Sequence, residues 1–241
     1  MHLPPRDGAS DGSPDPSPNA RTSRGEESRQ KIVEAALALF REKGYEETTM
    51  RAVAERAGVA LGNAYYYFQS KEHLLQAYYA RSHEAHLERV KPILARERTL
   101  EGRLKGLLTA KIEGEEPYHR FAGLLFKSAA DPESPLNPFS PESSATRQAA
   151  TALFGEVLAG AKLRVPADLK ARLPQMLWLF EMSVILFWIH DRSPGRARTH
   201  ALIEHATSLV VRLISLASNP FLAPLRKKAL RLLDAISADI P

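Results

Sequence analysis

Histidine and glutamate side chains could support metal binding or acid–base catalysis, and in this sequence they gather in two short segments. The segments are His83, Glu84 and His86, and His200, Glu204 and His205. A zinc site of the HExxH type needs two histidines four residues apart on one helical face, with the glutamate directly after the first. Neither segment has that spacing, and surface histidines on amphipathic helices account for both. Since the sequence also lacks cysteine, a glycine-rich phosphate loop and a nucleophile elbow, it predicts no enzyme, no metal and no cofactor.

The composition is that of a globular chain with a modest basic excess. Among 241 residues, 33 lysines and arginines exceed 28 aspartates and glutamates, which gives a formal net charge of +5. This balance suits a nucleic-acid partner without requiring one. The longest apolar stretch, from Met176 to Ile189, is predicted too short to span a membrane and contains Glu181, and the N-terminus lacks the apolar run of a secretory signal. We therefore expect a soluble, cytoplasmic protein with no membrane partner.

The stretch from Thr48 to Lys71 has the spacing of a helix-turn-helix. Ala54 is small enough to let two helices approach closely, and Gly58, four residues later, tolerates the positive φ of a tight turn. The residues after Gly58 would form a short helix whose exposed face could enter a DNA major groove. Taken alone, Ala54 and Gly58 are equally consistent with an ordinary helical hairpin that carries surface aromatic residues.

The motif elements around this stretch follow one another in a specific order. A helix ends at Gly44-Tyr45, then come a Thr-Thr start, the AxxxGV turn, the Tyr-Tyr-Tyr-Phe end and a Ser-Lys-Glu start of the next helix. From Ser28 to Leu75 the chain resembles the DNA-binding domain of the TetR family of bacterial transcriptional regulators. The resemblance implies an all-α fold, in which an N-terminal three-helix helix-turn-helix DNA-binding domain is joined through a fourth helix to a larger helical ligand-binding and dimerisation domain.

The chain divides into three predicted parts. Residues 1–26 are rich in Pro, Ser, Gly and Asp and poor in large apolar side chains, so we expect a disordered tail. Residues 27–75 would form the DNA-binding domain and residues 76–241 the effector-binding and dimerisation domain. Apolar residues at three- and four-residue intervals predict helices throughout, with no strand. The expected helices are 27–43, one that Thr48 or Thr49 caps, 60–66, one from Lys71 that ends near Pro92, 99–113, 117–130, 144–162, 167–191, 196–217 and 222–238.

The resemblance assigns DNA contacts to residues of this sequence. Base edges are expected to meet Leu61, Asn63 and Tyr66, because asparagine can pair with adenine and aliphatic side chains can contact a thymine methyl. Phosphates are expected to meet helix N-termini, hydroxyls, basic groups and closely approaching backbone. The predicted phosphate-contacting residues are Thr49, Arg51, Gly62, Tyr65, Tyr67 and Lys71. One of the three consecutive tyrosines is expected to pack inside the domain instead.

Two positions depart from the pattern of many family members. Ala60 stands where a serine or threonine is usual, and the missing hydroxyl removes a helix cap worth about 1 kcal/mol. Leu61 stands where a lysine is usual, which removes a contact to phosphate or guanine. Both changes make the reading face less electrostatic, so the operator sequence does not carry over from relatives.

For the larger domain, the resemblance implies a homodimer and a cavity for a small effector. The family pairs through its last two long helices, which correspond here to about 167–191 and 196–217. The predicted interface residues are Phe187, Trp188, Leu202, Leu209 and Leu213. The predicted ligand-binding residues, which follow no motif, are Tyr79, Phe121, Leu125, Trp178 and Met182. A plain subunit core remains the alternative for both sets.

These features predict a ligand-responsive homodimeric repressor that binds a palindromic operator in double-stranded DNA. The segment GNAYYYF, residues 62–68, is similar to that of actinobacterial regulators of lipid synthesis that sense long acyl chains, which favours an apolar or acyl-type effector. One alternative is a regulator whose ligand promotes DNA binding, as a co-repressor or activator. The other is a membrane-surface or interaction protein, suggested by the basic amphipathic helix around Arg226 and Arg231.

Overall fold

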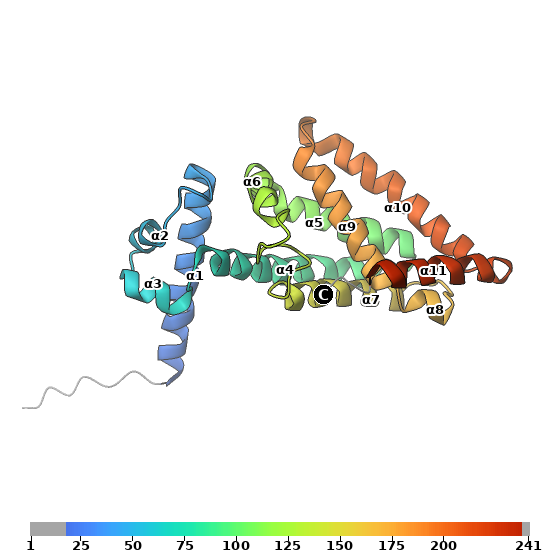
Figure 1. Ribbon diagram of the computed structural model, residues 1–241, viewed down its shortest axis with the longest axis horizontal. Helices are drawn as coiled ribbons and strands as arrows, with labels where there is room; N and C mark the ends of the chain where they lie inside the picture. Colours follow the sequence, from blue (N-terminus) through green and yellow to red (C-terminus); the bar gives the residue numbers. More distant parts are fainter. Residues whose placement is uncertain (1–17, 238–241) are drawn as a thin grey trace, which may run out of the picture.

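The computed structural model describes residues 18–237 and shows an elongated, all-helical molecule, with no strand in that range. A small head formed by the first three helices stands at one end, and a larger helical body occupies the rest (Figure 1). Helix α4 leaves the head and runs along the body. The predicted fold class is thereby confirmed.

The head is built from α1 (Pro18–Lys43), α2 (Met50–Ala57) and α3 (Leu61–Tyr67). Apolar residues at helical spacing give α1 one buried face, as the periodicity predicts; they are Ile32, Val33, Ala36, Leu39 and Phe40. α2 and α3 pack against this face and against each other. The three helices therefore form one small core that holds α3 in place.

Local signals define the ends of α2. Thr49 is the N-cap and accepts a hydrogen bond from the Ala52 amide on its side-chain oxygen, at 3.2 Å. Gly58 follows the helix with φ at +67°, a conformation that costs glycine nothing, and its amide donates to carbonyls of the last turn. α3 begins after Ala60, which offers no side-chain cap, as expected from its missing hydroxyl.

The predicted boundary of the disordered tail is wrong for the residues after Ser17. α1 begins at Pro18 rather than near Glu27, and residues 1–17 of the predicted tail lie outside the described range. The prediction weighed only apolar burial. Once a packed helix exists, however, extending it adds a backbone hydrogen bond for each residue fixed. An ion pair between Arg29 and Glu26, 3.6 Å apart, adds support one turn into this extension.

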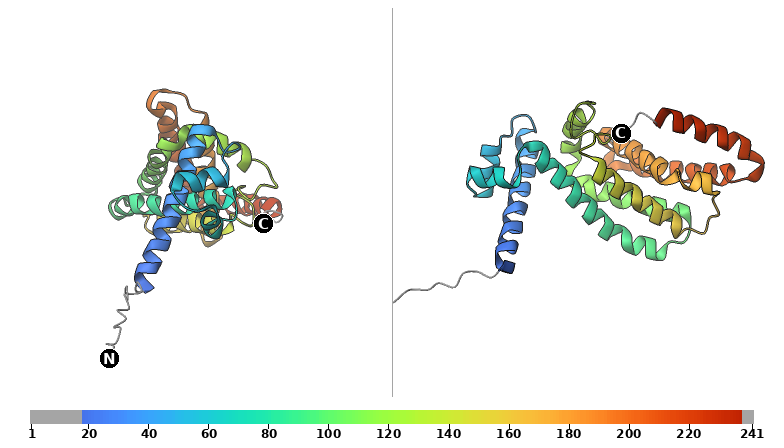
Figure 2. Two further views of the ribbon diagram at one scale, coloured as in Figure 1. Left: turned by 90° about the vertical axis from the view of Figure 1, so that its left-hand side faces the viewer. Right: turned by 60° about the horizontal axis from the view of Figure 1, so that its bottom comes forward.

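Helix α4 (Lys71–Arg96) joins the head to the body. It was predicted to end near Pro92, yet it continues for a further turn to Arg96. Proline lacks the amide donor and its ring crowds the carbonyl four residues earlier, but Pro92 is exposed and stands close to the end of the helix, where few hydrogen bonds remain to be lost. α4 packs along α5, touches α7 in the body and touches α1 in the head, as the two views of Figure 2 also show.

Within the described residues, the body packs six longer helices and four short ones around a second core. They are α5 (Leu100–Glu115), a 3₁₀ turn (Glu116–Tyr118), α6 (His119–Ala129), α7 (Ser144–Ala159), α8 (Ala167–Lys170), α9 (Leu173–His190), a 3₁₀ turn (Pro194–Arg196), α10 (Ala197–Ala217), a 3₁₀ turn (Pro220–Leu222) and α11 (Ala223–Ser237). The proline-rich segment between α6 and α7 is an irregular loop, as predicted. Leu104, Phe154 and Trp188 are among the fully buried side chains of this second core.

Two expectations about the C-terminal half need correction. The single helix predicted for residues 167–191 is two, because Pro174 occupies the first turn of α9 and the chain turns between Lys170 and Leu173. α9 is also long and apolar enough to cross a membrane by length and composition, so length alone does not exclude a span. Its contacts with α5, α6, α7 and α10 are those of a core helix.

Helix α11 is amphipathic and packs on the body rather than standing free. The Arg226 guanidinium donates to the Asp168 carboxylate at 3.1 Å and to the Ala217 carbonyl at 2.8 Å, and Leu230 is buried. Its remaining basic residues, Lys227, Lys228 and Arg231, are exposed. These contacts favour a docked helix with solvated charges over a membrane-surface role.

Arg103 on α5 clamps the ends of two other helices. Its buried guanidinium donates to the carbonyls of Leu94 and Glu97 at the end of α4, and to those of Glu156 and Val157 at the end of α7, all at 2.7–3.0 Å. Helix C-termini leave carbonyls without intrahelical partners and carry partial negative charge, so one planar cation can satisfy both ends. The far end of α4 is thereby fixed to α5 and α7.

We expect Arg103→Met to lower the free energy of unfolding by about 3 kcal/mol, because four carbonyls lose their charged donor in a buried site. Urea unfolding followed by circular dichroism measures the change. Arg98→Met, at an exposed position close in sequence, is the matched control and should change stability by less than about 0.5 kcal/mol. A similar small change for Arg103→Met would contradict the clamp.

Candidate functional site

Helix α3 presents a polar and aromatic face at the free end of the head. Tyr66 is 80% exposed and Tyr65 48% exposed, and Gly62 and Asn63 beside them are also exposed. The Tyr66 ring meets the Tyr67 ring edge to face, with centroids 5.1 Å apart. An exposed tyrosine cluster on a short helix after a tight turn has no function in the head core, and its face is free to meet an external partner.

Not every residue predicted for this face is available on it. Tyr67 and Leu61 are half-buried and pack against the head core, so Tyr67 is the tyrosine that packs inside the domain. Ala64 and Phe68 are buried as predicted, and the Arg29 guanidinium lies over the Phe68 ring, 5.4 Å from its centroid. The inner side of α3 thus anchors the helix.

The N-terminal turn of α2 adds two exposed groups to the same end of the head. Thr49 is exposed although its side-chain oxygen caps the helix, and Arg51 is exposed two residues later. Arg56, by contrast, is held by Glu42 through two hydrogen bonds of 2.7 and 2.9 Å. Thr49 and Arg51 therefore fit the predicted phosphate-contacting role.

Lys71 already has intramolecular partners. Its ammonium donates to the carbonyls of Tyr45 at 2.8 Å and Glu46 at 3.3 Å, and lies 4.4 Å from the centroid of the Tyr45 ring. The Tyr45 hydroxyl in turn donates to the Glu72 carboxylate at 2.6 Å. In this structure Lys71 joins the start of α4 to the turn after α1, and its phosphate contact stays a prediction.

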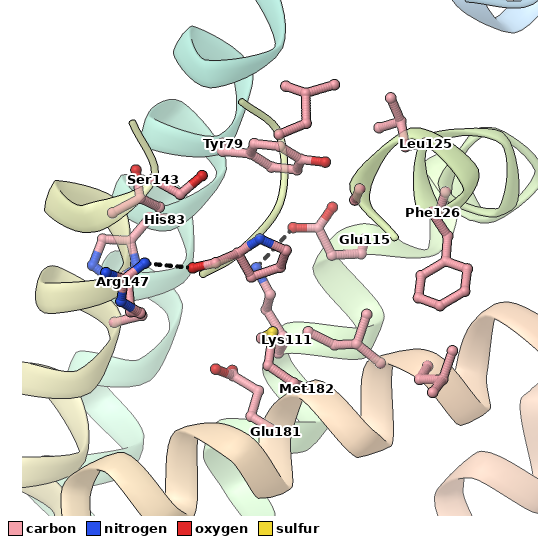
Figure 3. Close-up of a pocket in the computed structure, with 18 of the residues that line it drawn as sticks. Tyr79, His83, Lys111, Glu115, Leu125, Phe126, Ser143, Arg147, Glu181 and Met182 are labelled. Atoms are coloured by element: carbon pink, nitrogen blue, oxygen red, sulfur yellow. Dashed lines mark hydrogen bonds and ion pairs between the residues drawn. The ribbon is translucent and has the colours of Figure 1, made fainter. Parts of the chain in front are cut away.

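The body contains a cavity of about 620 Å³. All five residues predicted to bind ligand line it, although lining does not test binding: Tyr79, Phe121, Leu125, Trp178 and Met182. Figure 3 shows side chains from α4, α5, α6, α7 and α9 converging on this space. A cavity of this size, with mostly apolar walls and a few polar groups, is typical of a site for a small molecule.

Several polar residues of the cavity were not predicted, and they form a paired group on α4 and α5. The Glu115 carboxylate accepts hydrogen bonds from Tyr78 at 2.8 Å, from Lys111 at 3.1 Å and from Ser82. Burial raises the pKa of Glu115, but the Lys111 ammonium and these hydrogen bonds outweigh burial and leave the pKa below its ordinary value. This carboxylate is therefore ionised and internally neutralised.

Two other polar side chains of the cavity have a different environment. Glu181 on α9 is 5% exposed, and burial raises the pKa of its carboxyl to about 7, with Lys111 lowering it in part. His86 on α4 is 3% exposed, and burial lowers the pKa of its imidazole to about 3, so the ring is neutral. In sequence His86 belongs to the His-Glu-Ala-His segment, but in the described structure no group of histidine, cysteine and acidic residues could hold a metal.

Part of the cavity wall also packs against the head. Phe121 of α6 lines the cavity and also stacks on Phe40 of α1, with ring centroids 5.5 Å apart and planes 9° apart. Beside it, the Arg41 guanidinium lies over the Tyr118 ring at 5.4 Å. Sequence periodicity shows that Phe40 and Phe121 are both apolar, but only the folded chain shows that they meet.

The predicted dimer residues fall into two groups. Phe187, Leu209 and Leu213 are exposed on α9 and α10, together with Leu179, Leu186 and Leu216. Trp188 is wrong as an interface residue, because it is 1% exposed and its indole donates to Glu116 at 2.8 Å. Leu202 is half-buried against the body core. On α9, Trp188 faces the subunit core, whereas the preceding residue, Phe187, faces outward.

The raised pKa of Glu181 predicts a pH-dependent stability. A carboxyl that titrates near 4.5 when unfolded and near 7 when folded binds more protons in the folded state between these values, so stability falls as pH rises through this window. The free energy of unfolding of Glu181→Gln, taken as a difference from the wild type, should therefore rise by roughly 1–3 kcal/mol from pH 5 to pH 8. Urea unfolding at the two pH values measures this, with exposed Glu113→Gln as control. Parallel pH dependence in all three proteins would contradict the burial of a proton on Glu181.

Comparison with protein families matches both parts of the chain. The family model described as "Bacterial regulatory proteins, tetR family" covers residues 32–78, which are the head and the start of α4. The model described as "Tetracyclin repressor-like, C-terminal domain" covers residues 103–230, more than half of the chain.

The curated relatives resemble this chain over a limited part of its length. The HTH-type transcriptional repressor KstR of Rhodococcus jostii is 51% identical over 73 residues, which are 30% of this chain and 32% of that protein. The transcriptional regulator SrpR of Pseudomonas putida is 38% identical over 86 residues, 35% of this chain and 40% of that protein. The chain thus spans about a third of the length of the curated relatives it matches.

Solved structures extend the likeness to most of the fold. FadR of Thermus thermophilus, a repressor whose structure is described in complex with lauroyl-CoA, is 25% identical and has a TM-score of 0.57, covering 76% of this chain and 92% of that one. A regulator from Syntrophomonas wolfei has a TM-score of 0.62 at 17% identity, covering 77% and 95%, which shows the fold alone. Members of the matched family are regulators rather than enzymes. The chain belongs to the TetR family.

Proposed function

We propose that this protein is a cytoplasmic, homodimeric repressor that binds a palindromic operator and releases it when an apolar effector fills the body cavity. The observation that carries the proposal is the double role of α4. Its N-terminal turns pack on the head, and Tyr79, His83 and His86 farther along the same helix line the cavity. Any ligand that shifts this helix also shifts the head.

The proposed DNA-reading surface is the exposed face of α3 with the start of α2. Asn63 and Tyr66 would contact base edges, and Thr49, Arg51 and Tyr65 would contact phosphates. Half-buried Leu61 could add an apolar contact to a thymine methyl, whereas Tyr67 and Lys71 would act by holding α3 and α4 in place.

Gly62 supports the close approach of a partner to this surface. A side chain at Gly62 would meet no protein atom within 4 Å, and its φ lies outside the left-handed region. Glycine inside a helix costs about 1 kcal/mol relative to alanine. The head itself thus gives no reason for glycine here, whereas a phosphate backbone pressed against α3 would.

The proposed homodimer forms through the exposed apolar faces of α9 and α10. These faces carry Leu186, Phe187, Leu209 and Leu213, all at least 40% exposed. Monomeric proteins seldom expose so many large apolar side chains on adjoining helices. Pairing two copies about a two-fold axis would bury this surface and present two α3 helices to half-sites one helical turn apart, or a multiple of it.

The proposed effector is apolar, with an acyl-type molecule as the leading class. The part of the cavity wall formed by Phe121, Leu125 and Phe126 is apolar. The similar Thermus thermophilus FadR is described in complex with lauroyl-CoA. Ligand in the cavity would favour one position of α4 and of the Phe121–Phe40 contact over another. The shift in DNA affinity can be no larger than the ligand's difference in affinity between the two positions.

DNA binding by purified protein tests the proposal. The wild type should bind the DNA upstream of its own gene more tightly than scrambled DNA, with two subunits per site and an affinity that falls steeply with salt. Tyr66→Ala should weaken binding to the upstream DNA by about 1–3 kcal/mol and relax sequence preference. Tyr65→Phe, which removes only a phosphate-bonding hydroxyl, should weaken binding to both DNAs alike. Fluorescence anisotropy over a salt series measures all three proteins.

Two results of that experiment would count against specific parts of the proposal. Identical behaviour of Tyr66→Ala and Tyr65→Phe would contradict the division into base and phosphate contacts. Unchanged affinity for the upstream DNA after addition of lauroyl-CoA and dodecanoic acid would contradict an acyl-type effector, and tighter binding would show that ligand promotes DNA binding instead.

Gly62→Ala should separate folding from DNA binding. We expect the free energy of unfolding to rise by about 0.5–1 kcal/mol, because alanine favours the helix and its methyl group meets no protein atom. Operator affinity should fall at least fivefold, because the methyl group would stand between α3 and a phosphate. Gly155→Ala, on α7 and equally open, is the matched control and should stabilise without affecting DNA binding. Full operator affinity in Gly62→Ala would contradict a close backbone approach.

A further inference from the structure

His86 is a polar side chain without a partner at the wall of the cavity. It is 3% exposed, and neither Nδ1 nor Nε2 has a hydrogen-bond partner among the described residues. A neutral imidazole carries one donor and one acceptor. Leaving such a group buried and unpaired is destabilising, so the empty site is less stable than one that completes these bonds.

Glu181 is a second polar group that faces the same space. No hydrogen bond joins its carboxyl to any described residue, and Figure 3 shows it projecting from α9 toward the interior occupied by Lys111 and Glu115. His86 and Glu181 both line this cavity, as do Lys111 and Glu115. Together His86 and Glu181 provide hydrogen-bond donors and acceptors inside the cavity that have no partner among the described residues.

Several other polar groups of the cavity are already engaged. Lys111 and Glu115 pair with each other, and Glu115 also accepts from Tyr78 and Ser82. The Arg147 guanidinium donates to the carbonyls of Pro138 at 2.7 Å and Ser140 at 3.1 Å, which fixes the loop before α7. The structure thus distinguishes these engaged groups from groups such as His86 and Glu181, which have no hydrogen bond to a described residue.

We propose that the cavity takes an apolar molecule that carries a hydroxyl group, and that this hydroxyl is seated against His86 and Glu181. The proposal rests on the effector role of the cavity and narrows the chemical class of the effector. A hydroxyl both donates and accepts, which matches a neutral imidazole and a carboxyl that holds its proton near neutral pH.

Other head groups match these two side chains less well. A carboxylate would lie in the field of the ionised Glu115, and its charge would be desolvated without a free cation among the described lining residues, since Lys111 is already paired. An ether accepts but cannot donate, and a hydrocarbon does neither. A site built to hydrogen-bond a hydroxyl discriminates against an analogue that lacks it, because its own polar groups then stay unpaired.

Three compounds with equal numbers of heavy atoms separate these cases: dodecan-1-ol, its isomer 1-methoxyundecane, and tridecane. The two tryptophans of the chain, Trp178 and Trp188, both line the cavity, so their fluorescence reports occupancy of that space. For each protein, the ratio of the ether's Kd to the alcohol's Kd isolates recognition of the hydroxyl from general partitioning out of water. Tridecane gives the affinity of the apolar walls alone.

His86→Phe removes both nitrogens and keeps a ring of similar size. We expect the ether-to-alcohol Kd ratio to fall about tenfold relative to the wild type, which corresponds to about 1.4 kcal/mol. The melting temperature should rise at the same time, because an unpaired polar group is lost. Glu181→Leu should lower the ratio in the same direction and serves if His86→Phe fails to fold. Thr207→Val removes another buried hydroxyl that lacks a partner, outside the cavity, and should leave the ratio unchanged.

The outcomes distinguish failure of the hydroxyl inference from failure of the proposed effector role. Equal ratios in the wild type and in both cavity variants would overturn hydroxyl recognition, while the effector role would stand if any compound still changed operator affinity. A tenfold fall in the ratio, with no effect of any compound on operator affinity, would support the hydroxyl site and contradict the effector role. If dodecan-1-ol fails to bind up to its solubility limit, the inference is overturned.

Discussion

The buried guanidinium of Arg103 is the interaction on which the arrangement of the body depends. It satisfies carbonyls at the ends of both α4 and α7, and Gly160 leaves it the room to do so, since a side chain there would overlap the guanidinium. α4 and α7 both line the cavity, through residues such as Tyr79 and Arg147. Fixing their far ends leaves motion to the ends nearer the head. α4 can then act as a lever whose pivot lies in the body.

The head end of that lever is set by a different kind of interaction. Lys71 and Glu72 at the start of α4 bond to the turn after α1, and Phe121 of α6 stacks on Phe40 from the other side. The contact between head and body is therefore partly polar and partly aromatic. Aromatic stacking tolerates small sliding motions better than directional hydrogen bonds do. The Phe121–Phe40 contact is thus the side of the joint at which the filling of a cavity can be transmitted.

How much of this could be predicted from sequence depends on the range of each interaction. Gly58, Thr49 and the buried face of α1 act within one or two helical turns, so their patterns identified the head. Trp188 was misjudged, because its partner Glu116 lies 72 residues away and leaves no periodic signal. The bond of Lys71 to Tyr45, 26 residues away, was missed for the same reason. The five predicted cavity residues do line one space, but the polar groups between them were missed. His86 was considered only for metal spacing, since its burial becomes visible only when α4, α5 and α9 are packed together.

The unpaired polar groups inside the cavity lower the stability of the empty fold, and we interpret this loss as a consequence of the proposed ligand recognition. An unpaired imidazole and a carboxyl forced to keep its proton both lower the stability of the empty fold, and leucine or phenylalanine would fill either position at no such cost. A site that carries unsatisfied groups gains more from an occupant that completes them than a purely apolar site can. Under the proposed effector role, the same deficit would couple binding to conformation, because the ligand would stabilise most strongly the arrangement of α4 and α9 in which His86 and Glu181 reach it together. Specificity and switching would then arise from one structural cause.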